Sequence, residues 1–362
     1  MRVGILTFHH SENFGAVLQT LALQSLLVSW GHDVVVLNHA SHPSAPWSRW
    51  RDAQGGFAKP AERLRGLIHG RKYRAEFALF RKESLRLTRF LPDSQALAEA
   101  TRGLDIIFAG SDQVWHFSRE PRYFLQWSPP FAGRKVSYAA SCGSDVQPET
   151  DRPRIGSWIR SFDFVSVRDD FSARLVRQVS GSTPEIVADP TLLVDPTPWI
   201  RQPSHLPEKF FLLYHLGTSP AGLAPWMRRM QESHGPIPWV WINGQGDRIP
   251  KPPPTEIKIW HAAPGEWLGS IQGCQGLLTD SFHAVLFALR FQKSFFISCS
   301  DTFRNPRLAD LATRYELAGH LMPRFDESGA TSWIHPAATT QIKIQAHVEE
   351  SLGFLRRALA KP

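Results

Sequence analysis

The sequence predicts an α/β protein made of two doubly wound, Rossmann-like domains that face each other across a cleft. Short apolar runs alternate with helical segments along most of the chain, which is typical of βαβ units in a parallel sheet. A chain of 362 residues is also longer than one ordinary hydrophobic core requires. The Pro-rich, polar stretch "DPTPWIRQPSHLPEK" separates two such series. We therefore place an N-terminal domain at residues 1–195 and a C-terminal domain at 208–362, with a linker between them.

The first 40 residues show the βαβ pattern most clearly. The strand "RVGILTF" leads through the polar loop "HHSENFG" into "AVLQTLALQSLLVSWG". In that segment Leu18, Leu21 and Leu26 recur at helical spacing, and Gly31 is a natural C-cap. The run "HDVVVLNH" then predicts a buried strand. After an interruption at about 41–100, the alternation resumes in "LDIIFAGSDQVW", "RKVSYAASCG", "FDFVSVRDDFSARLVRQVSG" and "PEIVADPTLLVD".

The second series repeats the alternation. Strands are predicted in "FFLLYHLG", "PWVWIN" and "EIKIW", followed by helix, strand, helix and strand in "GEWLGSIQGCQGLLTDSFHAVLFALRFQKSFFIS". A last helix is predicted from Val348, Leu352, Leu355 and Leu359, which fall on one face. We assign this helix to the C-terminal domain.

The composition is that of a soluble globular enzyme, with 42% hydrophobic and 20% charged residues. The N-terminal segment lacks the apolar region and cleavage site of a signal peptide, and no segment approaches roughly 18 continuous apolar residues. The three cysteines, Cys142, Cys274 and Cys299, have no CxxC spacing. This argues against a disulfide scaffold or a structural zinc site and favours a reducing compartment. We expect a cytoplasmic protein.

The positive charge is concentrated in one region, which we expect to be a largely helical insertion at about 41–100. Within residues 41–90 an excess of basic over acidic side chains equals the net charge of +8 of the whole chain. Tyr73, Phe77 and Phe80 recur at helical spacing between the basic residues. Such a helix at 60–90 is suited to the anionic inner face of a membrane. The alternative is a helix that packs its aromatic face between domains. We do not expect nucleic acid to bind, because no nucleic-acid module is visible.

Polar residues follow several of the predicted strands. Ligands of open parallel sheets collect beyond the carboxyl ends of the strands, so these loops form a candidate site. Each residue also has a plain structural explanation: Asn13, Gly15 and Ser281 as caps or turns, Asp112 as a partner of loop amides, and Arg168 as a member of an ion pair. The candidate residues are Asn13, Phe14, Gly15, Ser111, Asp112, Gln113, Arg168, Ser281 and His283.

His283 is the sharpest candidate, because it lies in the first turn of a predicted helix. The free amides and partial positive charge of a helix N-terminus favour anions, and a histidine there can donate a hydrogen bond or a proton. A buried structural histidine is the alternative. Farther along, "RNPRLADL" supplies Arg304 and Arg307, either to the same anion or to a helix surface. No GxGxxG, P-loop, HExxH or GxSxG motif is present, which excludes the usual dehydrogenases, kinases, zinc proteases and esterases.

Taken in order, these segments resemble the polysaccharide pyruvyl transferase family. The resemblance is carried by "GILTFHHSENFGAVLQTLALQSLL", "FAGSDQVW", "VSVRDDFSARLV", "VADPTLLVD" and "LLTDSFHAVLFALRFQKSFF", and it spans roughly residues 2–315. The family commonly has glycine after the Ser-Phe-His triplet, where this chain has Ala284. The resemblance implies a GT-B-like fold and the transfer of pyruvate from phosphoenolpyruvate to a sugar as a ketal. A nucleotide-sugar glycosyltransferase and a non-catalytic carbohydrate- or anion-binding protein are the alternatives.

The resemblance also implies roles for the candidate residues. His283 would be the acid or the donor to the leaving phosphate, and Asp112 would orient or deprotonate an acceptor hydroxyl. The acceptor would be a sugar of a bacterial exopolysaccharide or of its lipid-linked precursor. We expect no metal or cofactor besides the donor substrate, since arginines can compensate its charge. The donor-binding set is Arg168, Ser281, His283, Lys293 and Arg304; the acceptor-binding set is Asn13, Phe14, Gly15, Ser111 and Gln113.

Overall fold

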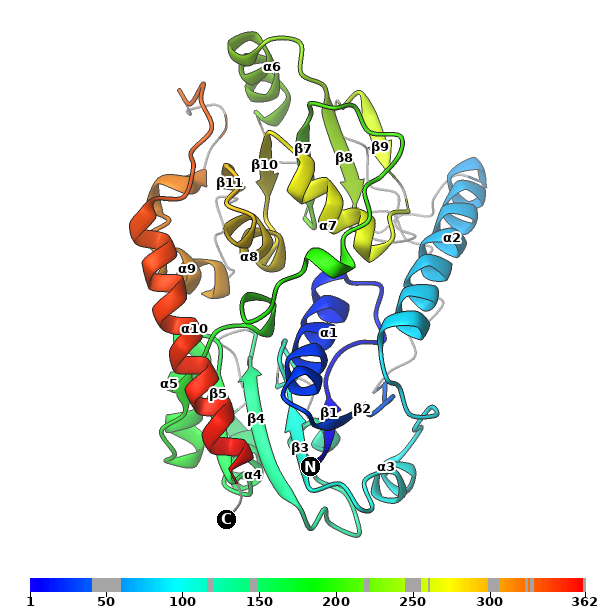
Figure 1. Ribbon diagram of the computed structural model, residues 1–362, viewed down its shortest axis with the longest axis vertical. Helices are drawn as coiled ribbons and strands as arrows, with labels where there is room; N and C mark the ends of the chain where they lie inside the picture. Colours follow the sequence, from blue (N-terminus) through cyan, green and yellow to red (C-terminus); the bar gives the residue numbers. More distant parts are fainter. Residues whose placement is uncertain are drawn as a thin grey trace.

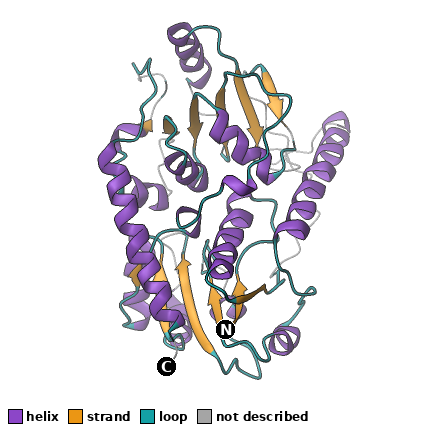
Figure 2. Ribbon diagram, viewed as in Figure 1, coloured by secondary structure: helices purple, strands orange, loops and turns teal. Residues whose placement is uncertain are grey.

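The computed structural model of the chain shows two α/β domains stacked along the long axis of the molecule (Figures 1 and 2). The description that follows concerns residues 1–40, 60–115, 120–143, 149–217, 222–244, 255–259, 261–298, 306–322, 325 and 329–360, with the side chains of residues 60–67 left aside.

The N-terminal sheet has six parallel strands in the order β2-β1-β3-β4-β5-β6. Its strands are β1 (Arg2–Leu6), β2 (Asp33–Val36), β3 (Ile106–Ala109), β4 (Arg134–Ala140), β5 (Phe164–Val167) and β6 (Glu185–Ile186). Its helices are α1 (Phe14–Ser29), α3 (Ser94–Ala100), α4 (Arg152–Ile159) and α5 (Asp170–Ser180). The predicted strands are therefore confirmed.

The C-terminal sheet is also six-stranded and parallel, in the order β12-β11-β10-β7-β8-β9. Its strands are β7 (Phe211–His215), β8 (Trp239–Asn243), β9 (Ile257–Ile259), β10 (Gly276–Thr279), β11 (Phe295–Ser298) and β12 (Leu321–Met322). Its helices are α6 (Leu223–His234), α7 (Pro264–Gly273), α8 (Phe282–Arg290) and α9 (Pro306–Arg314). The apolar alternation did not predict α6 and α9, whose outer faces are polar.

Strand order reverses between β1 and β3 in one sheet and between β7 and β10 in the other. In doubly wound sheets such a reversal opens a crevice beyond the carboxyl ends of the strands. The arrowheads of β4 and β8 point toward the boundary between the two domains (Figure 1). The two sets of loops therefore meet there, as the predicted GT-B-like fold requires.

Helix α2 (Pro60–Ser84) lies in the N-terminal half of the sequence but packs against the C-terminal domain (Figure 1). Tyr73 and Phe77 are buried against Phe14 of α1, and the ring of Phe14 stacks on that of Trp267 in α7, with centroids 5.0 Å apart. The aromatic face of the insertion is therefore buried at the domain boundary. The interpretation as a domain-packing helix is confirmed, and insertion of these aromatic rings into a membrane is excluded.

Helix α10 (Ala338–Leu359) bridges the two domains (Figure 1). Near its start, Thr340 donates a hydrogen bond to the carbonyl oxygen of Tyr315 at 2.9 Å. Near its end, Phe354 and Leu355 are buried in the core of the N-terminal sheet. The sequence had grouped this helix with the C-terminal domain, but its apolar stripe is shared because it is long enough to reach both cores.

Among the helices of the described residues, none combines the length and apolarity that crossing a membrane requires.

Replacing Phe77 with Ala should destabilise the protein by about 3–5 kcal/mol, because the side chain is fully buried among other rings. Leu79→Ala is the matched control on the same helix: Leu79 is 47% exposed, so its loss should change stability by less than about 0.5 kcal/mol. Thermal and urea unfolding measure both. Equal effects of the two substitutions would contradict the packing of α2 described above.

Candidate functional site at the domain boundary

Asp189, which follows β6 at its carboxyl end, lies at the centre of a buried polar cluster. Its Oδ2 accepts hydrogen bonds from Arg168 Nη1 at 2.9 Å and from Ser111 Oγ at 3.0 Å. Its Oδ1 accepts from the backbone N–H and the hydroxyl of Thr191 at 3.1 and 2.9 Å. His283 Nε2 lies 3.5 Å from Oδ2. One carboxylate thus contacts loops of the N-terminal domain and the first turn of α8 in the C-terminal domain.

Arg168, the residue after β5, joins the two carboxylates of the cluster. Its Nη2 donates to Asp112 Oδ1 at 3.0 Å while its Nη1 donates to Asp189, and its side chain is 0% exposed. The guanidinium also lies over the ring of Phe282, with its carbon 4.7 Å from the centroid. Of the two interpretations of Arg168, the ion pair is confirmed: protein carboxylates compensate its charge in this structure, and donor binding stays a prediction.

Asp112 sits in a turn of unusual backbone conformation, with φ at +71°. This left-handed region is uncommon outside glycine and is typical of sites where surrounding structure holds a side chain in place. Its carbonyl oxygen accepts from the N–H of Ser141 at 2.9 Å, which ties the turn to the end of β4. The strained turn directs the Asp112 carboxylate toward Arg168.

His283 is held between the two domains. A Cβ built on Gly15, in the first turn of α1, would lie 2.0 Å from His283 Nδ1, so only glycine lets the imidazole pack against α1 here. On its other edge the imidazole faces Asp189. The side chain is 9% exposed, and within the described residues its Nε2 makes no hydrogen bond of ordinary geometry. His283 is therefore both buried, as one alternative held, and placed at the meeting point of the two helix N-termini.

The charged side chains of the cluster shift one another's pKa values. Burial raises the pKa of Asp112, but the Arg168, His283 and Arg307 side chains outweigh it and hold that pKa below its usual value. The pKa of Asp189 is lowered in the same way, because the effects of His283 and Arg168 outweigh that of burial. Both carboxylates are therefore ionised at neutral pH. Burial, together with the charge of Arg168, lowers the pKa of Arg307 to about 10, which leaves it protonated at pH 7.

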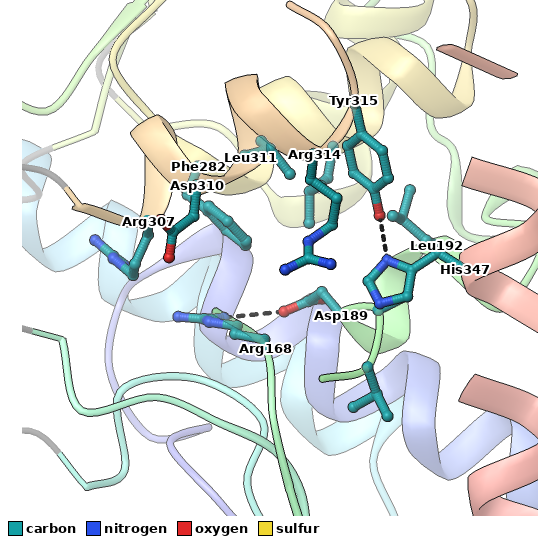
Figure 3. A pocket seen from close by; sticks show the side chains of 13 residues that line it. Arg168, Asp189, Leu192, Phe282, Arg307, Asp310, Leu311, Arg314, Tyr315 and His347 are labelled. Carbon is teal, nitrogen blue, oxygen red and sulfur yellow. Dashed lines mark hydrogen bonds and ion pairs between the residues drawn. The ribbon is translucent and has the colours of Figure 1, made fainter. Parts of the chain in front are cut away.

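Arg307 and Arg314 of α9 add further cations from the C-terminal domain. With the Gln113 amide oriented so that its oxygen faces Arg307, that oxygen accepts hydrogen bonds from Nη1 and Nη2 at 2.8 and 3.2 Å. Arg314 donates to Asp170 at 3.0 Å and extends toward Asp189 in Figure 3. The space between these groups measures about 10 Å³, room for one water molecule at most. The site is closed in this structure.

Several predicted site residues have structural tasks instead. Asn13 and Ser281 cap helices, accepting from the N–H of Ala16 at 3.1 Å and of Ala284 at 3.4 Å. Ser111 is fully buried and donates to Asp189. Phe14, expected to contact the acceptor, is a core residue because its position at the start of α1 faces Trp267.

Lys293 does not reach the cluster in this structure. It lies between α8 and β11, beyond the end of α8 opposite to His283, and that end is seven residues and therefore about 10 Å along the helix from His283. This placement argues against the expected donor-binding role in the arrangement seen here. Arg304 lies outside the described residues.

Asp189 and Arg314 are not among the site residues predicted from the sequence, and Arg307 is only a secondary candidate there. Asp189 could have been found, because "VADPT" places it directly after a strand, where Asp112 and Arg168 were found by the same rule. Arg314 carried no signal in the sequence, since a basic residue near the end of a helix ordinarily faces solvent.

Replacing Asp189 with Asn should lower the melting temperature at pH 7 by several degrees, because it removes a buried charge that compensates Arg168. The folded-state pKa lies below the ordinary value of about 3.9. The ionised carboxylate therefore stabilises the fold above that pH, and this contribution is lost as the pH falls further. The difference between wild type and variant should shrink between pH 5 and pH 3. Asp33→Asn, at an exposed position, is the control; a pH-independent difference for Asp189→Asn would contradict the depressed pKa.

Comparison with known proteins places this site in context. No curated protein sequence matches the chain. Solved structures of similar overall fold include the UDP-GlcNAc 2-epimerase of Methanocaldococcus jannaschii in complex with UDP-GlcNAc and UDP, with a TM-score of 0.49, 9% identity and coverage of 99% of this chain and 100% of that one. The glycosyltransferase SnogD from Streptomyces nogalater matches with a TM-score of 0.43 and 14% identity. The match covers 98% of this chain and 96% of that one. At these values we draw no conclusion about function from either structure.

The sequence model described as "Polysaccharide pyruvyl transferase" matches residues 13–298, which is more than half of the chain. The matched range contains Asp112, Arg168, Asp189 and His283. The chain therefore belongs to the polysaccharide pyruvyl transferase family.

Proposed function

We propose that this protein transfers pyruvate from phosphoenolpyruvate to two hydroxyl groups of a saccharide, forming a cyclic pyruvate ketal and releasing phosphate. The observation that supports this most is the His283–Asp189–Arg168–Asp112 cluster, which draws a histidine, two carboxylates and an arginine from both domains to one point. Family membership supports the saccharide acceptor. The donor, the ketal product and the acceptor polymer are part of the proposal.

The reaction requires one acid and hydrogen-bond acceptors for two hydroxyl protons. A proton added to the methylene carbon of phosphoenolpyruvate gives a methyl group and an oxocarbenium-like centre, which the first hydroxyl attacks. Departure of phosphate regenerates an electrophilic carbon, and the second hydroxyl closes the ketal. Of the two protons released by the hydroxyls, one replaces the proton given to the methylene carbon and the other leaves with phosphate. The acid must therefore be regenerated from an acceptor hydroxyl.

His283 suits the role of that acid, because a histidine side chain can donate a proton or a hydrogen bond. Asp189 lies 3.5 Å from Nε2, and Gly15 packs against the other edge of the ring, so the imidazole is held in one place. Asp112 has a depressed pKa, which makes it a weak proton acceptor. Asp112 was expected either to orient or to deprotonate an acceptor hydroxyl. The lowered pKa favours the first role, in which the carboxylate accepts a hydrogen bond from the hydroxyl.

Donor binding requires the domain boundary to open. A space of about 10 Å³ is far below the roughly 300 Å³ of small-molecule sites, so phosphoenolpyruvate does not fit the closed arrangement. Opening would separate Arg307 and Arg314 on α9 from their partners in the N-terminal domain, Gln113 and Asp170, and expose these two guanidinium groups to an anion (Figure 3). Arginine is well suited to phosphate and carboxylate, since it binds both in a bidentate way. Closure around the donor would then exclude water.

The proposal extends to the cellular setting. The acceptor would be a sugar of a bacterial cell-surface polysaccharide or its lipid-linked precursor, modified in the cytoplasm. Contact with the inner membrane would use the outer face of α2, where Arg71, Lys72 and Leu79 are exposed, since the aromatic face is buried.

Calorimetric titration with phosphoenolpyruvate should show saturable binding, whereas a panel of nucleotide sugars should show none. Arg307→Gln should weaken the binding of phosphoenolpyruvate about tenfold or more, because a charged contact to phosphate is lost. Arg177→Gln, an exposed change on α5, is the matched control and should leave binding unchanged. Binding of a nucleotide sugar without a response to phosphoenolpyruvate would instead support the glycosyltransferase alternative.

Replacing His283 with Gln should reduce phosphate release in the presence of donor and a panel of saccharide acceptors by about 10²–10⁴-fold, the usual contribution of a general acid. The affinity for phosphoenolpyruvate should change little, because the amide still donates a hydrogen bond. His335→Gln replaces an exposed histidine and should retain full turnover. Loss of donor affinity with unchanged turnover at saturation would reassign His283 from acid to donor binding.

A further inference from the structure

A second, open cavity lies beside the N-terminal sheet, where no role has been assigned so far. It measures about 580 Å³, which is within the range of small-molecule sites. Its walls come from the loop after β1, the end of β2 and the last turns of α2 with the segment that follows. They include His9, His10, Asn38, Arg81, Lys82 and Phe90, and we call this the His9–Lys82 pocket.

The charge of the His9–Lys82 pocket is positive. Arg81, Lys82 and Arg89 line it, and none of the residues that line it is an aspartate or glutamate. Arg89 pairs with Glu99 at 3.3 Å, in an exposed and therefore weak ion pair. Arg81 Nη1 donates to the carbonyl oxygens of His10 and Ser11 at 3.1 and 3.3 Å, and these contacts hold the loop. Glu12 lies close enough to interact with the Arg81 guanidinium, whereas Lys82 is exposed at the pocket wall. A ligand of this pocket should carry a negative charge.

The remaining groups are suited to sugar hydroxyls. His9 is fixed by contacts of its Nδ1 with the carbonyl oxygen of Thr7 at 3.0 Å and of its Nε2 with Asn38 at 3.1 Å. Burial, with the nearby His9, Arg81 and His39, lowers the pKa of His10 to about 4. A neutral imidazole offers one donor and one acceptor, as a hydroxyl partner needs. Phe90 is 58% exposed and gives the pocket a flat apolar surface.

The position of the pocket links it to the candidate active site. The loop that carries His9 and His10 continues directly into α1, where Gly15 contacts His283. Gly15 is the fifth residue after His10, and five residue steps span at most about 18 Å. A saccharide held in the pocket is thus within a few sugar units of His283.

We propose that the His9–Lys82 pocket binds an anionic saccharide unit, one that carries a carboxylate or a phosphate beside its hydroxyls. Its identification as part of the acceptor rests on the function proposed above; the existence of the site does not. Arg81 and Lys82 bind the anion, the His10 imidazole and the Asn38 amide bind hydroxyls, and Phe90 covers the apolar face of the ring. His9 supports the site by holding Asn38 in place.

The test is a binding titration of the full chain with glucuronic acid, glucose 1-phosphate and glucose, without phosphoenolpyruvate. The two anionic sugars should bind at least about tenfold more tightly than glucose, as expected for a charge-assisted hydrogen bond. Lys82→Gln should remove this preference. Lys72→Gln, an exposed change on the same helix outside the pocket, should preserve it. Comparison of the two anionic sugars tells whether a carboxylate or a phosphate is preferred.

Equal binding of glucose and the anionic sugars, or an anion preference that survives Lys82→Gln, would overturn the proposal. Because both substituted lysines are exposed, loss of the fold does not explain a change in binding. The titration involves neither donor nor turnover. Failure of the pocket proposal is therefore distinguishable from failure of the pyruvyl transferase proposal, which phosphoenolpyruvate binding tests separately.

Discussion

The buried carboxylate of Asp189 is the interaction on which the rest of the site depends. It receives hydrogen bonds from Arg168, Ser111 and Thr191 and faces His283 across the domain boundary. Removing one partner of such a buried pair usually costs about 3–5 kcal/mol, because the other charge stays buried without compensation. Arg168, Ser111 and Thr191 belong to the same domain as Asp189, so these contacts fix the carboxylate in the position where it faces His283 of the other domain.

We assign the two substrates to two different sites: the donor to the closed cluster at the domain boundary, and the saccharide to the open His9–Lys82 pocket. At the domain boundary, arginines and carboxylates satisfy one another, and the remaining space holds at most one water molecule. Arg307 and Arg314 become available to a ligand there only when the domain boundary opens and their contacts with Gln113 and Asp170 separate. The His9–Lys82 pocket already has room, and three basic side chains line its walls. In this arrangement the saccharide site is preformed, whereas the donor site forms by exchange of internal partners for an anion.

The fold could be predicted because each strand is a short, nearly continuous apolar run, the usual form of a strand buried on both faces. Site residues were predictable where they directly follow such a run, as Asp112 and Arg168 do. Their partners were not predictable: an ion pair was one interpretation of Arg168, but nothing local identifies Asp112 and Asp189 as the carboxylates that surround it. Phe14 looked like a loop residue because its partner Trp267 lies about 250 residues away. A position such as that of Arg314 depends on how two domains dock, which no local pattern encodes.

The course of α10 has a mechanical consequence. The chain passes from the first domain to the second after β6 and returns through this helix, whose last turns are buried against the N-terminal sheet. Two bodies joined at two separate points keep one easy rotation, about the line through both connections, while sliding and twisting strain one of them. Opening of the boundary should therefore follow a single hinge axis, so that the two halves of the site come back into the same register after each cycle.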